Sequence, residues 1–227
     1  MPNEKNELAI LILIGGKSNR LGTEKGIIKI LGKPLISYQI ETLKKFDNEV
    51  FLVAHSDDQI QHYRNQMIVP KDVYFIVDDR EFFTYEKINK PMLGVYSGLK
   101  ELELLGFKKA FILSCDMPLI NMNVIKLLIS ESINHECVIP CWNNGFLEYF
   151  FAIYPVKKGF EKAKKILTTK NYGLTNFVDK NWDISYVSIE DTIQPLDKNL
   201  VSFININGPI DVYKVINLFQ NSNNILE

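Results

Sequence analysis

A short loop rich in glycine and cationic side chains follows the first apolar segment of the chain. Gly15 and Gly16 come directly after Ile14, and Arg20 and Lys25 follow within the same loop. Adjacent glycines let the backbone approach a ligand closely, and consecutive backbone N–H groups in such a turn form an anion-binding concavity. Arginine suits bidentate contact with phosphate, and lysine acts as a compact positive charge. The loop therefore predicts a triphosphate site, although a polar surface turn with structural glycines would have the same composition.

Asp116 occupies a similar place after a later apolar segment, Ala110–Ser114. Mg²⁺ prefers oxygen ligands and takes one or two carboxylates, with phosphates and water completing its shell. Pro118 bends the chain at once and would fix the direction of Asp116. Asp116 is therefore a candidate Mg²⁺ ligand, while an aspartate at this spacing from proline also suits a turn or a helix cap. We expect Cys115 to pack under this turn rather than to act as a nucleophile.

The elements that must position these residues alternate along the first half of the chain. Short continuous apolar runs predict strands covered on both faces at Leu8–Ile14, Val50–Ala54, Val73–Val77 and Ala110–Ser114. Helical spacing or composition predicts helices at Leu35–Phe46, Asp57–Gln66, Gly94–Leu105 and Asn121–Ser132. This alternation indicates an α/β fold with a mostly parallel central sheet and helices on both faces. Both candidate loops then leave the carboxyl ends of strands, where ligands bind in such sheets.

The second half is less regular. It predicts strands at Leu147–Tyr154, Ile184–Ile189 and Ser202–Asn205, and helices at Val156–Leu167 and Pro209–Phe219. We expect residues 1–6 to form a flexible N-terminus and residues 7–227 to form a single domain with a mixed sheet edge. The aromatic group Tyr149, Phe150, Phe151 and Tyr154 fits core packing better than a stacking platform.

Composition excludes several classes of protein. The 227 residues carry a net charge of −1 and no basic stripe, which argues against a nucleic-acid partner. The three cysteines are an odd number in a chain of this size, which argues against a disulfide framework. His135, Cys137 and Cys141 lie close in sequence but lack a fourth ligand for zinc. No apolar run approaches the ~20 residues of a membrane helix, so we expect a cytoplasmic protein without a membrane partner.

Four segments, in order, resemble motifs of the molybdenum cofactor guanylyltransferase family, within the MobA-like nucleotidyltransferases. The loop Gly15–Lys25 resembles the pattern G-G-x-S-x-R-φ-G-x-x-K, and Pro91–Leu99 resembles P-L-x-G-x-x-x-G-L. Cys115–Pro118 reads C-D-M-P, and Asn205–Pro209 resembles N-x-N-x-P. The four segments span nearly the whole chain.

This resemblance implies a Rossmann-like three-layer sandwich of the nucleotide-diphospho-sugar transferase type. It implies transfer of GMP from GTP to molybdopterin with release of pyrophosphate, Mg²⁺ as cofactor, and possible transient contact with molybdopterin-handling proteins. The implied catalytic residues are Arg20, Lys25 and Asp116, with Asp116 as the metal ligand. The implied nucleotide-binding residues are Ile14, Gly15, Gly16, Ser18, Gly22, Lys25, Asp78, Asp79, Gly94 and Asp116.

For two pairs of residues, the sequence leaves both a binding role and a structural role open. Either Asp78 or Asp79 would accept hydrogen bonds from the N1–H and N2–H groups of guanine, while a solvated turn fits both equally well. Asn205 and Asn207 match asparagines on the second-substrate side, and their alternation in a strand would point both to one face. Asn207 could instead cap the last helix, because it lies two residues before Pro209.

The chain departs from the family pattern at a few positions. Ile14 stands for a usual Ala, Leu21 for Met, Glu24 for Asp, and Lys90 for Gly. Lys90 would change the loop beside the nucleotide, so the residues that contact the base stay undecided. A cytidylyltransferase acting on molybdopterin or on a sugar or polyol phosphate is the nearer rival, and the glycine pair Gly15-Gly16 favours guanine over it. A nucleotide-binding adaptor without catalysis is the rival from another class.

Overall fold

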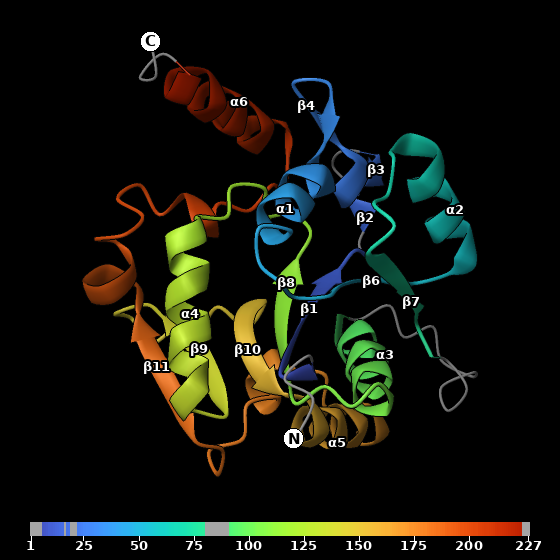
Figure 1. Cartoon of the computed structure of the whole chain (residues 1–227), viewed down its shortest axis with the longest axis vertical. Coiled ribbons are helices and arrows are strands. Elements are labelled where there is room, and N and C mark those ends of the chain that lie inside the picture. Colours follow the sequence, from blue (N-terminus) through green and yellow to red (C-terminus); the bar gives the residue numbers. More distant parts are fainter. Residues whose placement is uncertain (1–5, 16, 19–21, 80–90, 224–227) are drawn as a thin grey trace.

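A seven-stranded mixed sheet forms the centre of the computed structural model, which describes residues 6–15, 17–18, 22–79 and 91–223 (Figure 1). The strand order is β11-β9-β10-β8-β1-β6-β7. The bounds are β1 Leu8–Leu13, β6 Val50–Ala54, β7 Val73–Val77, β8 Lys109–Ser114, β9 Cys137–Cys141, β10 Phe151–Pro155 and β11 Ile184–Ser188. Strand β10 runs antiparallel to both of its neighbours, and every other pairing in the sheet is parallel. The predicted mostly parallel sheet is confirmed.

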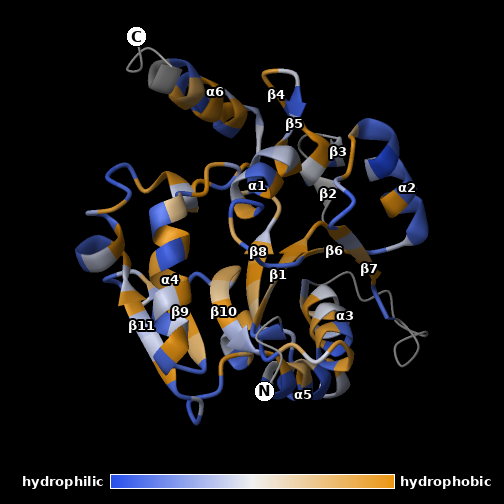
Figure 2. Cartoon of the chain, in the orientation of Figure 1, coloured by the Kyte–Doolittle hydropathy of each residue, from blue (hydrophilic) through white to orange (hydrophobic). Residues whose placement is uncertain are grey.

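Helices cover both faces of the sheet. Their bounds are α1 Leu35–Leu43, α2 Asp57–Gln66, α3 Pro91–Leu104, α4 Met122–Asn134, α5 Val156–Thr168 and α6 Pro209–Asn223. Side chains alternate along a strand, so Ile10 and Ile12 pack with residues of α1 and α4, whereas Ala9 and Leu11 pack with residues of α3 and α5. Figure 2 shows these central strands as predominantly hydrophobic. The result is the predicted three-layer α/β architecture.

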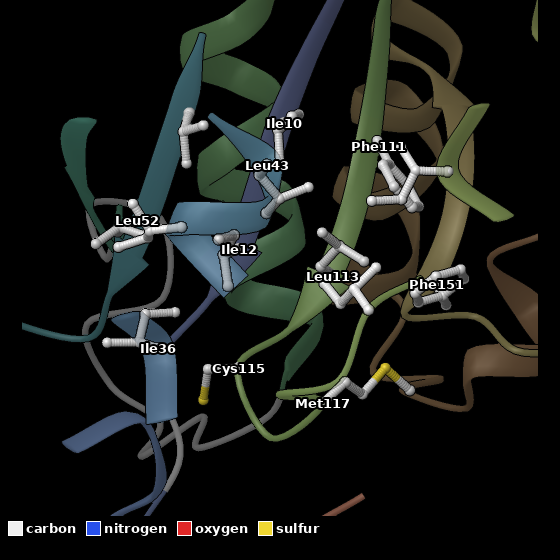
Figure 3. Close-up of a cluster of buried hydrophobic side chains, with 14 of the residues drawn as sticks. Ile10, Ile12, Ile36, Leu43, Leu52, Phe111, Leu113, Cys115, Met117 and Phe151 are labelled. Atoms are coloured by element: carbon white, nitrogen blue, oxygen red, sulfur yellow. The ribbon is translucent and has the colours of Figure 1, made fainter. Parts of the chain in front are cut away.

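The loop that follows β8 closes one end of the core. Figure 3 shows Cys115 and Met117 on this loop, beyond Leu113 and Ile12 in the same apolar cluster. The side chain of Cys115 is 2% exposed, and burial strongly raises the pKa of its thiol. Cys115 is therefore a packing residue under the turn, as predicted.

Two short ribbons and a terminal helix lie beside the carboxyl ends of the strands. The ribbons pair β2 Lys17–Ser18 with β3 Thr23–Glu24 and β4 Lys29–Ile30 with β5 Lys33–Pro34. Helix α6 packs on the second ribbon through Val215 and Ile30, apart from the two main cores, as Figure 1 shows. Among the described residues, no helix combines the length and the apolar character needed to cross a membrane.

The strand predicted at Ser202–Asn205 is wrong. Residues Val201–Phe203 form a 3₁₀ helix, and irregular backbone follows. The buried carboxylate of Asp197 explains the difference, because it accepts hydrogen bonds from the backbone N–H groups of Val201 at 3.0 Å and Ser202 at 2.9 Å. Asn205 and Asn207 consequently do not share a strand face.

The boundaries of other predicted elements differ less from those in the structure. The strand predicted at Leu147–Tyr154 begins only at Phe151, because residues 147–150 form a bridge and turn. Strand β9 was not predicted, and Cys137 at its start is fully buried. Residues 1–5 of the expected N-terminal segment lie outside the described residues.

Candidate functional site

The loops after β1 and β8 meet because their strands are neighbours. The two strands pair in parallel with Leu13 opposite Ser114, so both chains leave the sheet at the same edge. The backbone N–H of Cys115 donates to the carbonyl of Leu13 at 3.2 Å, which continues the pairing by one step. The sheet therefore brings the glycine-rich loop beside the turn that carries Asp116.

Lys25 stands at the centre of this edge. Its ammonium group lies 2.6 Å from Oδ2 of Asp116 and 2.8 Å from Oδ1 of Asn207. The backbone N–H of Ile206 also donates to the carbonyl of Asp116 at 2.9 Å. Three residues selected from separate parts of the sequence thus form one cluster, whose members are up to 182 positions apart.

Asp116 has one oxygen left over in this cluster. The residue is 7% exposed, and its Oδ1 is buried without a hydrogen-bond partner among the described residues. A buried carboxylate oxygen without a partner is costly, and a hard cation such as Mg²⁺ is the ligand type it favours. Its surroundings therefore fit a bound Mg²⁺ that shares Asp116 with Lys25.

Two buried glutamines fasten the loops of the site, and sequence reasoning missed both. Nε2 of Gln39 in α1 donates to the carbonyls of Ser114 and Met117, each at 2.7 Å, on either side of Asp116. Nε2 of Gln59 in α2 donates to the carbonyl of Ile14 at 2.9 Å. Each glutamine lies among the buried residues of its helix. A polar residue in an otherwise apolar helix stripe was the available signal.

A pocket of about 370 Å³ opens beside the Lys25–Asp116 pair. Its lining includes Gly15, Asp78, Gly94 and Asn205. A larger hollow of about 800 Å³ lies at the opposite edge of the sheet, around Leu8 and Val50. We assign the site to the smaller pocket, because it holds the convergent polar groups and lies at the carboxyl ends of the parallel strands.

The structure separates Asp78 from Asp79. Asp78 lines the pocket beside Gly94, where a Cβ added to the glycine would come 3.6 Å from Oδ1 of Asp78. The carboxylate of Asp79 instead forms an ion pair with Lys100, and its backbone N–H donates to Oγ of Ser97 at 2.8 Å. Of the two aspartates, Asp78 is the one that faces the site.

The opposite wall of the pocket comes from the segment between β9 and β10. It contributes Phe146, Leu147, Glu148, Tyr149 and Phe150. The core prediction is confirmed for Phe151 and Tyr154, which are fully buried, whereas Tyr149 and Phe150 line the pocket. Glu148 is a pocket residue that sequence reasoning missed, because nothing in its local pattern distinguishes it from a surface glutamate.

The remaining predicted positions are distributed along the glycine-rich loop. Ile14 is fully buried, and its N–H donates to the carbonyl of Val53 at 3.0 Å. Gly22 has a φ of +66°, a left-handed conformation that favours glycine. Gly16, Arg20 and Lys90 lie outside the described residues, as does the side chain of Ser18.

The alternative metal site does not form. The ring of His135 pairs with the carboxylate of Asp183 at 3.1 Å, and Cys137 is fully buried in β9. Within the described ranges, no group of three or more His, Cys, Asp or Glu side chains is arranged to hold a metal ion.

Comparisons with known proteins give a family and a fold. Residues 10–183 match the model of the MobA-like NTP transferase domain. A protein of Natranaerobius thermophilus named probable molybdenum cofactor guanylyltransferase is 30% identical, covering 91% of this chain and 94% of the relative. A protein of the same name from Thermococcus gammatolerans is 32% identical, covering 90% and 96%.

Solved structures agree on the architecture. The molybdopterin-guanine dinucleotide biosynthesis protein A of Archaeoglobus fulgidus superposes with a TM-score of 0.74 at 20% identity, covering 94% of this chain and 99% of that one. A 4-diphosphocytidyl-2C-methyl-D-erythritol synthase from Anaerococcus prevotii superposes with a TM-score of 0.67 at 13% identity, covering 96% and 97%. At these identities the likeness concerns the fold alone.

Proposed function

This chain belongs to the MobA-like NTP transferase family, and from that membership we propose that it is a molybdenum cofactor guanylyltransferase. It transfers GMP from GTP to molybdopterin, releases pyrophosphate and forms the molybdopterin guanine dinucleotide cofactor. The observation that carries the proposal is the convergence of Lys25, Asp116 and Asn207 at the carboxyl edge of the sheet. Relatives with the guanylyltransferase name align over nearly the whole chain.

The bond changes are those of an in-line phosphoryl transfer. A terminal phosphate oxygen of molybdopterin bonds to the α-phosphorus of GTP, while the bond from that phosphorus to the oxygen bridging to the β-phosphate breaks. The electron pair leaves with pyrophosphate, so no covalent enzyme intermediate is needed. The protein supplies positioning and charge stabilisation, which dominate catalysis in phosphoryl transfer.

We assign the triphosphate to the loop from Gly15 to Lys25, where Gly16, Ser18 and Gly22 would let the backbone approach the phosphates and Arg20 would add positive charge. The ammonium group of Lys25 would move from Asp116 toward the departing pyrophosphate as negative charge develops there. Asn205 and Asn207 would contact the phosphate of the second substrate, because Asn205 lines the pocket and Asn207 bonds to Lys25.

We assign Mg²⁺ to Asp116, whose buried Oδ1 has no partner in the described part of the chain. Bound there, the ion would supply positive charge to the triphosphate and the leaving pyrophosphate. The guanine base belongs near Asp78 and Gly94, where a carboxylate can accept from N1–H and the 2-amino group. We further propose that residues 7–227 act as one nucleotidyltransferase domain, that the enzyme is cytoplasmic, and that it contacts molybdopterin-handling proteins transiently.

A pyrophosphate-release assay with molybdopterin, Mg²⁺ and each of GTP, CTP, ATP and UTP tests this proposal. We expect release with GTP, and a loss on the order of 10²-fold in kcat for Asp116→Asn or Lys25→Met. Asp79→Asn is the matched control, because its carboxylate pairs with Lys100 outside the pocket lining. Release with CTP in place of GTP would indicate a cytidylyltransferase, and nucleotide binding without any release would indicate a non-catalytic adaptor.

A further inference from the structure

Glu148 lies on a wall of the pocket that the proposed GTP contacts do not use. Backbone hydrogen bonds fix its segment on both sides: the N–H of Glu148 donates to the carbonyl of Pro140 at 3.0 Å, and the N–H of Phe151 donates to the carbonyl of Glu148 at 3.1 Å. A further bridge pairs Leu147 with Cys141. The carboxylate of Glu148 is therefore presented to the pocket from a well-anchored backbone.

The carboxylate itself is only partly satisfied. Oε1 accepts a hydrogen bond from the indole Nε1–H of Trp142 at 2.7 Å. The structure gives Glu148 no ion pair with any described lysine, arginine or histidine. Burial raises the pKa of Glu148, with the hydrogen bond from Trp142 opposing that effect. An acid half-buried without a cation has acceptor capacity to offer a ligand with N–H donors.

The neighbours of Glu148 define the shape of that ligand. Phe146, Tyr149 and Phe150 line the pocket beside it. Aromatic side chains with one carboxylate suit a flat heterocycle that carries N–H groups along one edge. The 2-amino-4-oxopyrimidine ring of a pterin has such an edge, with a ring N–H and an amino group side by side.

The order of the strands decides which substrate belongs at Glu148. Asp78 follows β7 at one end of the order β10-β8-β1-β6-β7, and Glu148 precedes β10 at the other. The Lys25–Asp116 pair arises from the loops after β1 and β8, between them. Along the strand order, the site therefore has a carboxylate at Asp78, the proposed phosphate and metal centre at Lys25 and Asp116, and a second carboxylate at Glu148. The product of the proposed reaction has the matching sequence of guanine, pyrophosphate and pterin.

We propose that Glu148 is the specificity residue for the second substrate, and that it accepts hydrogen bonds from the 2-amino and ring N–H groups of the pterin. This inference rests on the proposed function for the identity of the second substrate. Asp78 would read the same donor pair on guanine, so the pocket would use two carboxylates to hold two rings with a common edge, one on each side of the phosphates.

Glu148→Gln tests the assignment, because glutamine keeps an oxygen for Trp142 and replaces the other acceptor by a donor. We expect KM for molybdopterin to rise roughly 10- to 100-fold, the range of one well-formed bidentate contact, while KM for GTP stays within about twofold. Asp78→Asn is the matched variant and should give the reverse pattern. An unchanged KM for molybdopterin in Glu148→Gln would overturn the proposal.

A binding measurement tests the proposed contact of Glu148 with the pterin independently of turnover. The probes are 6-hydroxymethylpterin phosphate and the corresponding lumazine phosphate, which has an oxygen in place of the 2-amino group. Binding of each probe to the full-length protein is monitored by the fluorescence of the probe itself. Wild type should prefer the pterin by at least about tenfold, and Glu148→Gln should lose most of that preference. Equal binding of both probes by wild type overturns the proposal. A preference that depends on Glu148, together with no pyrophosphate release, supports this site and contradicts the proposed function.

Discussion

Replacement of Gln39 by methionine should loosen the turn that carries Asp116. The amide of Gln39 is fully buried in α1 and donates to the carbonyls of Ser114 and Met117. Methionine has a similar length, no branch at Cβ and a good helix propensity, so the helix itself should tolerate the change. What is lost is the pair of hydrogen bonds that spans Cys115 and Asp116.

The expected loss of stability follows from those contacts. A buried acceptor left without a donor costs about 1–3 kcal/mol, so the two carbonyls together account for about 2–6 kcal/mol. Oε1 of Gln39 is itself buried without a partner among the described residues, and its removal should recover about 1–3 kcal/mol. With the same cost for each of the three groups, two losses and one gain leave the cost of one group, so we expect the free energy of unfolding to fall by about 1–3 kcal/mol in Gln39→Met.

Gln59→Met is the matched control. Both ends of the Gln59 amide are used, since Nε2 donates to the carbonyl of Ile14 and Oε1 accepts from the N–H of His55 at 2.8 Å. Its replacement removes two satisfied bonds and relieves no unpaired atom, so Gln59→Met should be the more destabilising change. Urea unfolding followed by circular dichroism gives both values at comparable precision.

Turnover should separate the two variants as well. Gln39→Met should lower kcat more than it raises KM for GTP, because the turn of Asp116 is disturbed and the Asp78 wall is not. Gln59→Met acts on the loop at Ile14 and Gly15, so it should mainly raise KM for GTP. A Gln39→Met protein within about 0.5 kcal/mol of wild type, or one that is less stable than Gln59→Met, would refute the reasoning from hydrogen-bond satisfaction.

Three further changes test the packing and the charges. Gly98→Ala would bring a Cβ to 2.5 Å from Cδ2 of Leu11, so denaturant unfolding should show a loss of about 1–3 kcal/mol; an unchanged midpoint would contradict this close contact of α3 with β1. The pKa of Glu148 is raised by burial in the folded state, so its contribution to stability is greatest below the ordinary glutamate pKa and is lost as pH rises through the folded value. The melting temperature of Glu148→Gln relative to wild type should therefore rise as the pH increases above the ordinary glutamate pKa of about 4.3, and a constant difference would contradict that direction. Asp79→Asn removes a partly exposed ion pair with Lys100, so the free energy of unfolding should fall by only about 0–1 kcal/mol and KM for GTP should not change. A raised KM for GTP would instead indicate that Asp79 contacts the base.

The first half of the chain shows how far local pattern reaches. The strands Val50–Ala54 and Val73–Val77 and the helix Asp57–Gln66 were predicted with the bounds that the structure has. Each is a short apolar run or a segment with a clear start, such as Ser56, whose side chain accepts from the N–H of Gln59. Such signals depend on neighbours within a few positions, so they can be read without knowledge of the fold.

The second half shows where local pattern fails. The apolar residues around Phe203 predict a strand, but Asp197 caps the segment into a 3₁₀ helix instead. The antiparallel direction of β10 depends on its pairing with β8, which runs from Phe151 opposite Leu113 to Pro155 opposite Lys109. Neither outcome is present in the pattern of the segment itself, because both depend on a partner outside it.

The sequence by itself determined the alternation of strands and helices, the loops at their carboxyl ends, and the two residues Lys25 and Asp116 whose chemistry suits a triphosphate and a cation. Only the tertiary structure decided that Asn207 completes their cluster, that Asp78 faces the pocket while Asp79 does not, and that Glu148 forms the far wall. The physical reason is the range of the interactions. Periodicity and side-chain chemistry are properties of residues close in sequence, whereas a contact such as that of Lys25 with Asn207, 182 positions away, exists only once the sheet has brought the loops together.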